Sequence, residues 1–281
     1  TPEAGMTETV AAFMNRIQSG QSLVNATWDD ASEKIKSLYG QQGHLSESVM
    51  EQILSAYSPH EREMRRYGRP SIGSGLIFPV DESKIIIDPV EIKDHWPRIA
   101  AIDFGWDHPT AVAWCAVDRD EDTFYVYDCH RESKASPAVH AQTIRSRPNF
   151  IPIAYPHDGN RRDSMGNPGL ADQYRNLGCN FLLEHFSNPP ALGNNKGSNS
   201  IEEGIMAMLQ SMEISNFKVF STLSNWFEEF RMYHRKGGKV VPFRDDLMSA
   251  TRYAFQSQRF AVSGSDPAWT QDITYKNYGI V

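Results

Sequence analysis

The stretch Arg98-Ile99-Ala100-Ala101-Ile102-Asp103 decides the fold of this chain of 281 residues. It is apolar up to its last residue, and Phe104-Gly105 follow. Successive side chains of a strand point to opposite faces, so Asp103 lies on the face opposite Ile102 and Phe104. A charge there is costly unless it has a partner or water. The stretch predicts a strand that delivers Asp103 to the end of a sheet, although an Asp that caps the Gly105 turn is the ordinary alternative.

Short segments rich in β-branched and aromatic residues surround this strand. Thr110–Val117 and Thr123–Cys129 follow it after tight turns and predict an antiparallel meander of three strands. Helices and strands then alternate: helix Pro137–Arg147, strand Ile151–Tyr155, helix Pro168–Leu177, strand Asn180–Leu183, helix Ser200–Met212, strand Phe217–Phe220, helix Thr222–Tyr233, a turn at Lys236–Lys239 and helix Asp245–Gln258. This order predicts an α/β fold of the ribonuclease H-like class, a mixed sheet flanked by helices.

The first hundred residues have a different pattern. Apolar residues at helical spacing predict helices over Thr7–Ser19, Ser46–Ala56 and Ser58–Tyr67. We therefore predict a helical connector over residues 1–96, the ribonuclease H-like domain over 97–262 and a tail over 263–281. The chain begins with Thr-Pro and not with Met, which suggests a piece of something longer.

Composition limits the class of protein. Hydrophobic residues make up 40% of the chain, enough for a core, and the net charge of -7 argues against a protein that coats DNA. Clustered carboxylates that hold cations would contribute to such a charge. The three cysteines form no paired motif, and no apolar run is long enough for a membrane helix, so we expect a protein of a reducing cytoplasm with no membrane partner.

Further carboxylates stand at the ends of other predicted elements. Asp158 follows the strand at 151–155, where an Asp-Gly turn is the ordinary alternative. Asp245 and Asp246 open the last helix, where an N-cap is the ordinary alternative. Together with Asp103 they predict one self-repelling cluster that suits Mg²⁺ or Mn²⁺. Two ions held about 4 Å apart hydrolyse phosphodiesters in other enzymes, so the cluster predicts a nuclease, with Asp103 as the bridging ligand. Which of Asp245 and Asp246 binds directly stays open.

Basic residues near these elements fit a DNA backbone. The candidates are Arg161, Arg162, Lys196, Arg235, Lys236 and Lys239. Each could equally be a solvated surface charge. His157 is a candidate for supporting Asp158 or positioning a water, and a simply packed histidine is the alternative. No phosphate-binding loop is present, so ATPase activity is not expected from this chain.

Five segments together resemble the large terminase subunits of tailed bacteriophages, most of all those of headful-packaging podoviruses. They are Thr1–Thr7, Tyr67–Phe78, Ala101–Trp106, Pro156–Gly159 and Asp245–Tyr253. The resemblance implies a ribonuclease H-like fold similar to resolvases and integrases, with metal-dependent cleavage of double-stranded concatemeric viral DNA in the host cytoplasm. It places the metal ligands on Asp103, Asp158 and Asp245/Asp246, whereas Ser249 stands where many relatives have Asp.

The resemblance also implies partners. They are double-stranded DNA, a small terminase subunit and the portal protein, on which the subunit docks transiently, while the ATPase motor lies outside this chain. Two other hypotheses remain open from the sequence. The first is a DNA-gripping and assembly module with negligible cleavage when isolated. The second is an actin-like phosphotransferase, against which the absence of paired phosphate loops counts.

Overall fold

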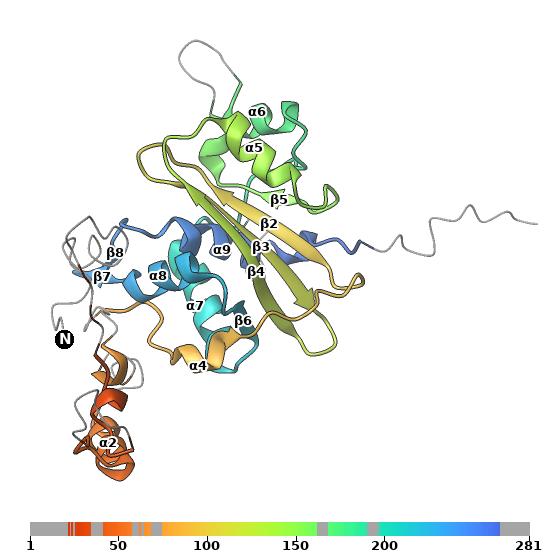
Figure 1. Ribbon diagram of the computed structural model, residues 1–281. Helices are drawn as coiled ribbons and strands as arrows, with labels where there is room; N and C mark the ends of the chain where they lie inside the picture. Colours follow the sequence, from red (N-terminus) through yellow and green to blue (C-terminus); the bar gives the residue numbers. More distant parts are fainter. Residues whose placement is uncertain are drawn as a thin grey trace, which may run out of the picture.

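A six-stranded mixed sheet in the order β1-β6-β4-β3-β2-β5 forms the centre of the computed structural model (Figure 1). The structure describes residues 22, 24, 26–34, 42–57, 62, 65–68, 75–161, 168–189 and 197–264. The strands of this sheet are β1 (Ile86–Ile87), β2 (Arg98–Asp103), β3 (Thr110–Asp118), β4 (Thr123–Glu132), β5 (Ile153–Ala154) and β6 (Phe217–Phe220). A separate hairpin pairs β7 (Arg235–Lys236) with β8 (Lys239–Val240).

The antiparallel meander predicted from the sequence is present as β2, β3 and β4. Its β3–β4 turn is closed by Asp118, whose Oδ1 accepts a hydrogen bond from the Asp120 N–H at 3.0 Å. The strand β4 runs three residues beyond its predicted end at Cys129, because β3 continues to pair with it as far as Thr110. This extension carries His130, Arg131 and Glu132 into the sheet.

Two predicted outer strands are shorter in the structure than the sequence suggested, and a third outer strand was not predicted. The predicted strand at 151–155 contributes only β5, which lies parallel to β2. The predicted strand Asn180–Leu183 is reduced to a single bridge from Phe181 to Ile153. The strand β1, which pairs in parallel with β6, was not predicted from the sequence. Two residues are too few for a periodic pattern to reveal a strand.

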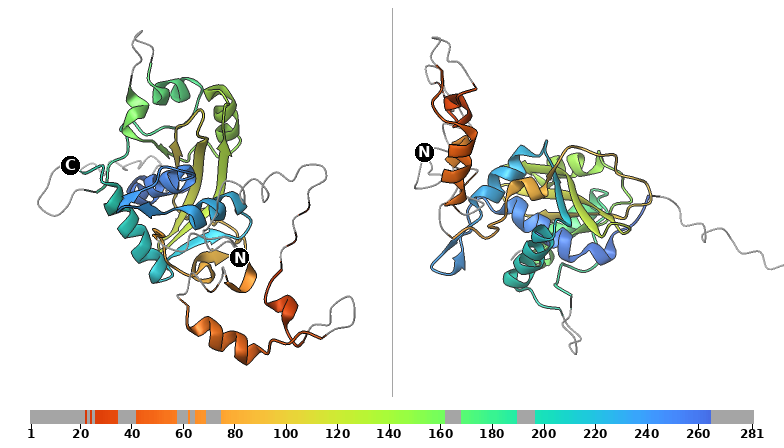
Figure 2. Two further views of the ribbon diagram at one scale, coloured as in Figure 1. Left: turned by 90° about the vertical axis from the view of Figure 1, so that its left-hand side faces the viewer. Right: turned by 90° about the horizontal axis from the view of Figure 1, so that it is seen from below.

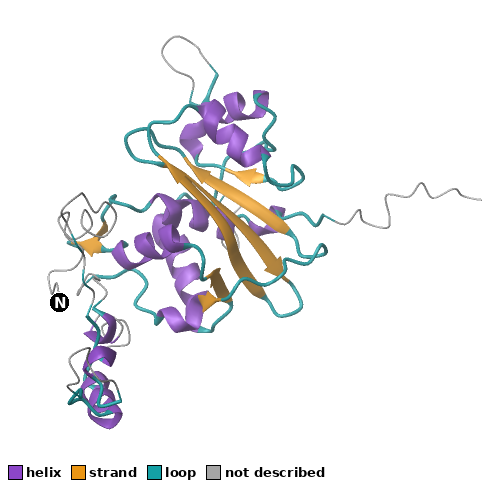
Figure 3. Ribbon diagram, in the orientation of Figure 1, coloured by secondary structure: helices purple, strands orange, loops and turns teal. Residues whose placement is uncertain are grey.

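Helices cover both faces of the sheet (Figure 3). On one face lie α7 (Ile201–Glu213), α8 (Ser224–Met232) and α9 (Asp246–Gln256), over a core that includes Ile99 and Ala101. On the other lie α5 (Pro137–Arg145) and α6 (Leu170–Asn176), over a core that includes Ala100 and Ile102. The side chains of β2 therefore alternate between two cores, as expected for a central strand with both faces covered.

The segment before the sheet contains two short helices with defined bounds, α2 (Glu47–Ser55) and α4 (Glu82–Ile85), and the 3-10 turn Asp29–Ala31. Ser46 caps α2 by accepting from the Val49 N–H at 3.3 Å. Figure 2 shows α2 standing apart from the sheet. In contrast, Ile77, Phe78 and Ile85 are buried in the core beneath α8, so the part of the chain that packs on the sheet begins before residue 97.

Some predictions fall on residues that the structure does not describe. The helix predicted at Thr7–Ser19 lies outside the described residues, as do parts of the helix predicted at Ser58–Tyr67 and nearly all of the tail. The division into 1–96, 97–262 and 263–281 stays a prediction. Within the described segments, no helix is both long enough and apolar enough to cross a membrane.

Candidate metal centre

Asp103 ends β2 on the face that α9 covers. The alternation along β2 places Ile99, Ala101 and Asp103 on that face, while Phe104 packs on the other with Tyr174 at 5.7 Å between ring centroids. The sequence had predicted this orientation from the strand period alone. The strand β2 has β3 on one side and β5 on the other. Asp103 itself pairs with Ala111 of β3, and β5 pairs with β2 at Ala100 and Ala101.

Asp158 lies one turn beyond β5, the parallel neighbour of β2. Its turn is the 3-10 segment His157–Asn160. Gly159 is pressed against aromatic rings, because a Cβ at this position would lie 2.7 Å from Phe104 and 2.8 Å from Tyr155. Only a glycine fits this approach, and it seats the turn against the end of β2. The two aspartates thus follow neighbouring parallel strands at the same edge of the sheet.

Asp245 and Asp246 stand where α9 begins, directly after Arg244, which adopts a positive φ of 50°. An N-cap role is the ordinary explanation for such acids, but the Asp245 side chain makes no capping hydrogen bond. Glu229 of α8 takes that role, because its Oε2 accepts from the Leu247 N–H at 2.6 Å. Both aspartate side chains are therefore available for another purpose.

The four carboxylates act on one another electrostatically. Burial raises the pKa of Asp103 well above its ordinary value, and the charges of Asp246, Asp245 and Asp158 raise it further. Burial and the neighbouring Asp246 raise the pKa of Asp245 to about 6. Burial also raises the pKa of Asp246. The structure thus brings together the acids that the sequence singled out, at a place where negative charge is disfavoured.

Two arginines and one histidine lie close enough to influence these acids. Arg252, further along α9, lowers the pKa of Asp103 and Asp245. His108 acts in the same direction on Asp245 and Asp246, and Arg131 on Asp246. These groups compensate the acids incompletely, because burial and mutual repulsion still dominate.

The donor set fits hard divalent cations. It consists of carboxylate oxygens that repel one another, and Mg²⁺ and Mn²⁺ prefer such oxygens over nitrogen or sulfur. Within the described residues, no three of the four carboxylates bring oxygens within 4.8 Å of one another. Separation of this kind is expected for like charges, and bound cations would reduce the repulsion.

The other predicted site residues differ in their exposure and in their partners. Arg161 is exposed and follows the Asp158 turn, whereas Arg162 and Lys196 lie outside the described residues. Lys236 and Lys239 are exposed on the β7–β8 hairpin, and Arg235 forms an ion pair with Glu202 at 2.5 Å. His157 is exposed, with its ring 6.3 Å from that of His185.

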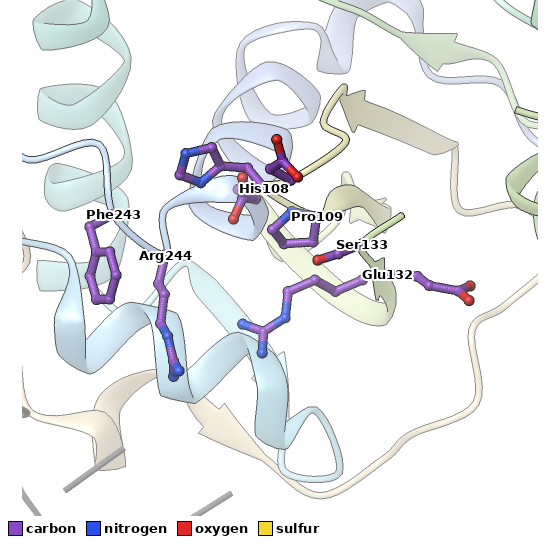
Figure 4. Close-up of a pocket in the computed structure, with 9 residues that line it drawn as sticks. His108, Pro109, Glu132, Ser133, Phe243 and Arg244 are labelled. Atoms are coloured by element: carbon purple, nitrogen blue, oxygen red, sulfur yellow. The ribbon is translucent and has the colours of Figure 1, made fainter. Parts of the chain in front are cut away.

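A cleft of about 480 Å³ opens beside the carboxylates (Figure 4). Asp246 contributes to its wall, so the cleft leads to the cluster. Its lining consists of Asp107, His108, Pro109, Arg131, Glu132, Ser133, Phe243, Arg244 and Asp246. Arg131 is held by Glu229 at 2.7 Å, and Arg244 is hydrogen-bonded to Glu228. The cleft therefore presents fixed positive groups next to the acids.

Sequence reasoning missed His108, Arg131, Glu229 and Arg252. Glu229 did give a signal, since it stands between Trp226 and Phe230 on the buried side of α8, where an acid is out of place. It is fully buried at 0% exposure. Arg252 lay inside a segment already recognised as informative but was given no role. His108 and Arg131 gave no comparable signal.

Residues 100–258 match the family described as Terminase RNaseH-like domain. The matched residues include most of the mixed sheet, the helices that flank it and the acids at its edge. The chain therefore belongs to the ribonuclease H-like domain family of terminases. This confirms both the predicted fold class and the resemblance to large terminase subunits.

Individual relatives support the same assignment. The chain is 38% identical over 262 residues to the large terminase subunit of Salmonella phage P22, and 38% identical over 256 residues to that of Enterobacteria phage LP7. These matches cover 93% and 91% of this chain but only 49% and 50% of the relatives, so the chain spans about half their length.

Solved structures agree. The P22 large terminase nuclease domain matches with a TM-score of 0.62 and 38% identity, over 68% of this chain and 96% of that domain. The large terminase of a thermophilic bacteriophage matches with a TM-score of 0.50 and 14% identity, over 76% of this chain and 52% of that one, which shows the shared fold alone.

Proposed function

We propose that this chain is the nuclease part of a genome-packaging terminase and cleaves double-stranded concatemeric viral DNA in a metal-dependent reaction. One observation supports the proposal: Asp103, Asp158 and the Asp245/Asp246 pair come from three separate elements, and burial together with the charges of the other three acids raises the pKa of Asp103. The 38% identity to the P22 nuclease domain supports the same reaction class.

The acids have distinct positions in this proposal. Asp103 would be a central metal ligand, because it ends β2, which lies between β3 and β5 in the sheet. Asp158 supplies ligands from one side, and Asp245 and Asp246 from the other. Mg²⁺ or Mn²⁺ ions held by these oxygens, two in number, would supply a water of lowered pKa and neutralise charge on the phosphodiester.

The surroundings of the acids assist in ways that depend only on this chain. Arg252 lowers the cost of gathering the carboxylates, and the Glu229–Arg131 pair holds the start of α9. Arg131 and Arg244 offer positive charge to a phosphate entering the cleft, which His108 also lines. Exposed Arg161, Lys236 and Lys239 extend that surface outward. Contacts of this type address the backbone and not the bases, so cleavage has little sequence preference.

Cleavage of supercoiled plasmid DNA in Mg²⁺ or Mn²⁺ tests the proposal. The Asp103→Asn variant should lose nicking and linearisation while it keeps its far-ultraviolet circular dichroism and its binding of DNA. Asp120→Asn, an exposed acid in the β3–β4 turn, is the matched control and should cut like the parent. Full cutting by Asp103→Asn would remove Asp103 from the reaction.

The same assay separates a DNA-gripping module from a nuclease. Such a module would bind DNA in EDTA and show no metal-dependent cutting by the unmodified chain. As part of a terminase, the chain would work in the host cytoplasm with double-stranded DNA, a small terminase subunit and the portal protein. It would depend on an ATPase lobe elsewhere for movement of the DNA.

A further inference from the structure

A second group of metal-binding side chains lies at the end of β4. His130 and Glu132 belong to β4, and His140 lies in the first turn of α5. His130 Nε2 is 3.1 Å from His140 Nδ1 and 3.8 Å from Glu132 Oε2. One ligand atom from each of the three residues lies within 4.8 Å of the others, and the described residues contain no second group that meets this condition.

This group faces away from the carboxylate cluster. His130 pairs with Val112, whose side chain belongs to the core beneath α5, whereas Arg131 pairs with Ala111 on the α9 side. Asp103 lies on the α9 side, opposite Ala111. The strand period therefore separates His130 and Glu132 from Asp103 across the thickness of the sheet. The two sets of side chains cannot share one ion.

The three side chains differ in their exposure to solvent. His140 is buried at 1% exposure, with its Nδ1 turned toward His130 Nε2. Glu132 is half exposed and keeps the third position open to solvent.

The spacing fits a tetrahedral ion. Two nitrogens about 2.0–2.1 Å from one zinc ion at the tetrahedral angle are about 3.3–3.4 Å apart. The observed separations of 3.1 and 3.8 Å lie on either side of that value. Two imidazoles and one carboxylate suit zinc and its neighbours, and not Mg²⁺. A neutral imidazole pair joined by a hydrogen bond is the alternative explanation of the 3.1 Å contact.

We infer that His130, Glu132 and His140 bind one transition-metal ion of the Zn²⁺ type, separate from the carboxylate cluster. Three protein ligands leave a fourth position for water or another small ligand. The ion would join the end of β4 to the start of α5. Glu132 also lines the cleft that Asp246 lines. An ion bound to Glu132 would therefore hold one wall of this cleft in place.

Zinc titration by calorimetry tests this inference. The protein is kept reduced and in excess Mg²⁺, so that Mg²⁺ already occupies the carboxylate cluster. One Zn²⁺ per chain should bind, and His140→Ala should abolish that binding. Glu132→Gln should weaken it at least about 100-fold, since even loss of a partner behind a ligand costs 10- to 100-fold. His185→Ala is the matched control, because this imidazole hydrogen-bonds to the adjacent Phe186 carbonyl and lies outside the group of three ligands, and it should bind Zn²⁺ as the parent does.

A second variant guards against misfolding of His140→Ala, which removes a buried ring. His130→Gln changes a less buried side chain and should also lose the Zn²⁺ while its circular dichroism and unfolding temperature in EDTA stay unchanged. Binding of no Zn²⁺ by the parent, or unchanged affinity in a folded His130→Gln, overturns the inference and leaves the imidazole hydrogen bond as the explanation. Asp103→Asn should bind Zn²⁺ as tightly as the parent, so this site and the proposed nuclease fail separately.

Discussion

The Glu229 carboxylate caps helix α9 by accepting the Leu247 N–H at 2.6 Å, although the two residues belong to different helices. Its other oxygen accepts from Arg131 of β4 at 2.7 Å. A single buried side chain thus connects the sheet to the helix that carries Asp245 and Asp246. Because Glu229 accepts a hydrogen bond from the first turn of α9, Asp245 and Asp246 are not needed as caps and their side chains are free to join the carboxylate cluster.

Removal of Glu229 should therefore loosen the site as well as the fold. Glu229→Ala leaves Arg131 without its main partner and the α9 start uncapped, and we expect a loss of about 3 kcal/mol in the free energy of unfolding. Glu229→Gln keeps the shape but turns one acceptor into a donor, and should cost about 1–2 kcal/mol. Urea unfolding measures both, and plasmid cleavage should fall in each.

Glu121→Ala serves as the control for Glu229, because Glu121 is an exposed acid at the β3–β4 turn. It should change stability by less than about 0.5 kcal/mol. Parent-like cleavage by a folded Glu229→Gln would show that the cap and the metal centre are independent.

Gly204 of α7 should matter for activity because Arg252 lies against it. A Cβ at this position would meet the Cγ and Cδ atoms of Arg252 at 2.7 Å. Gly204→Ala gains about 1 kcal/mol of helix propensity. The displaced Arg252 costs about 1–3 kcal/mol in overpacking, so stability should change little. Cleavage should nevertheless fall, because Arg252 no longer offsets the charge of Asp103 and Asp245.

Single-turnover cleavage and thermal unfolding, measured together, separate these two effects in Gly204→Ala. Met206→Ala, an exposed position on the same helix, is the matched control and should leave both unchanged. A Gly204→Ala protein that cuts at the parent rate would mean that the position of Arg252 is not needed.

Local sequence patterns could predict one part of this site. Asp103 follows from strand periodicity, and Asp158 follows because a second strand ends nearby in the order expected of the fold. Asp245 and Asp246 were ambiguous, since an acid at a helix start serves equally as a cap or as a ligand. In the structure Glu229 accepts the Leu247 N–H and the Asp245 side chain makes no capping hydrogen bond, so capping does not account for Asp245.

The supporting residues could not be predicted in the same way. Arg131 and Glu229 are 98 residues apart, and no periodic pattern relates them. The strand β1 was missed for a similar reason, because Ile86 is a strand residue only through its pairing with Val219. Tertiary partners, and not local propensity, decide such positions.

The buried acids should make the metal-free protein more stable as the pH falls. Burial and the charge of Asp246 raise the pKa of Asp245 to about 6 from its ordinary 3.8, and the pKa of Asp103 is raised as well. A carboxyl with a raised folded pKa stabilises the fold fully below its unfolded pKa and loses that contribution as the pH rises through the folded pKa. Unfolding temperatures in EDTA should therefore rise from about pH 8 toward about pH 5.5.

Asp103→Asn removes the largest of these penalties. In EDTA at about pH 8 we expect this variant to be more stable than the parent by about 1–3 kcal/mol. Mn²⁺ at about 100 times its dissociation constant should stabilise the parent by about 2.7 kcal/mol and this variant far less. An Asp103→Asn protein that is less stable than the parent under these conditions would contradict the assigned electrostatics.

Asp246 should be the more important member of the acid pair. Among neighbouring charges it has the largest effect on the pKa of Asp103, ahead of Asp245. It also lines the cleft and is the more buried of the two, at 7% exposure. Asp246→Asn should therefore abolish metal-dependent cleavage, whereas Asp245→Asn should retain part of it and need more Mn²⁺. Cleavage measured across a Mn²⁺ titration distinguishes the variants, with Asp120→Asn as the reference, and the reverse ranking would assign the direct ligand role to Asp245.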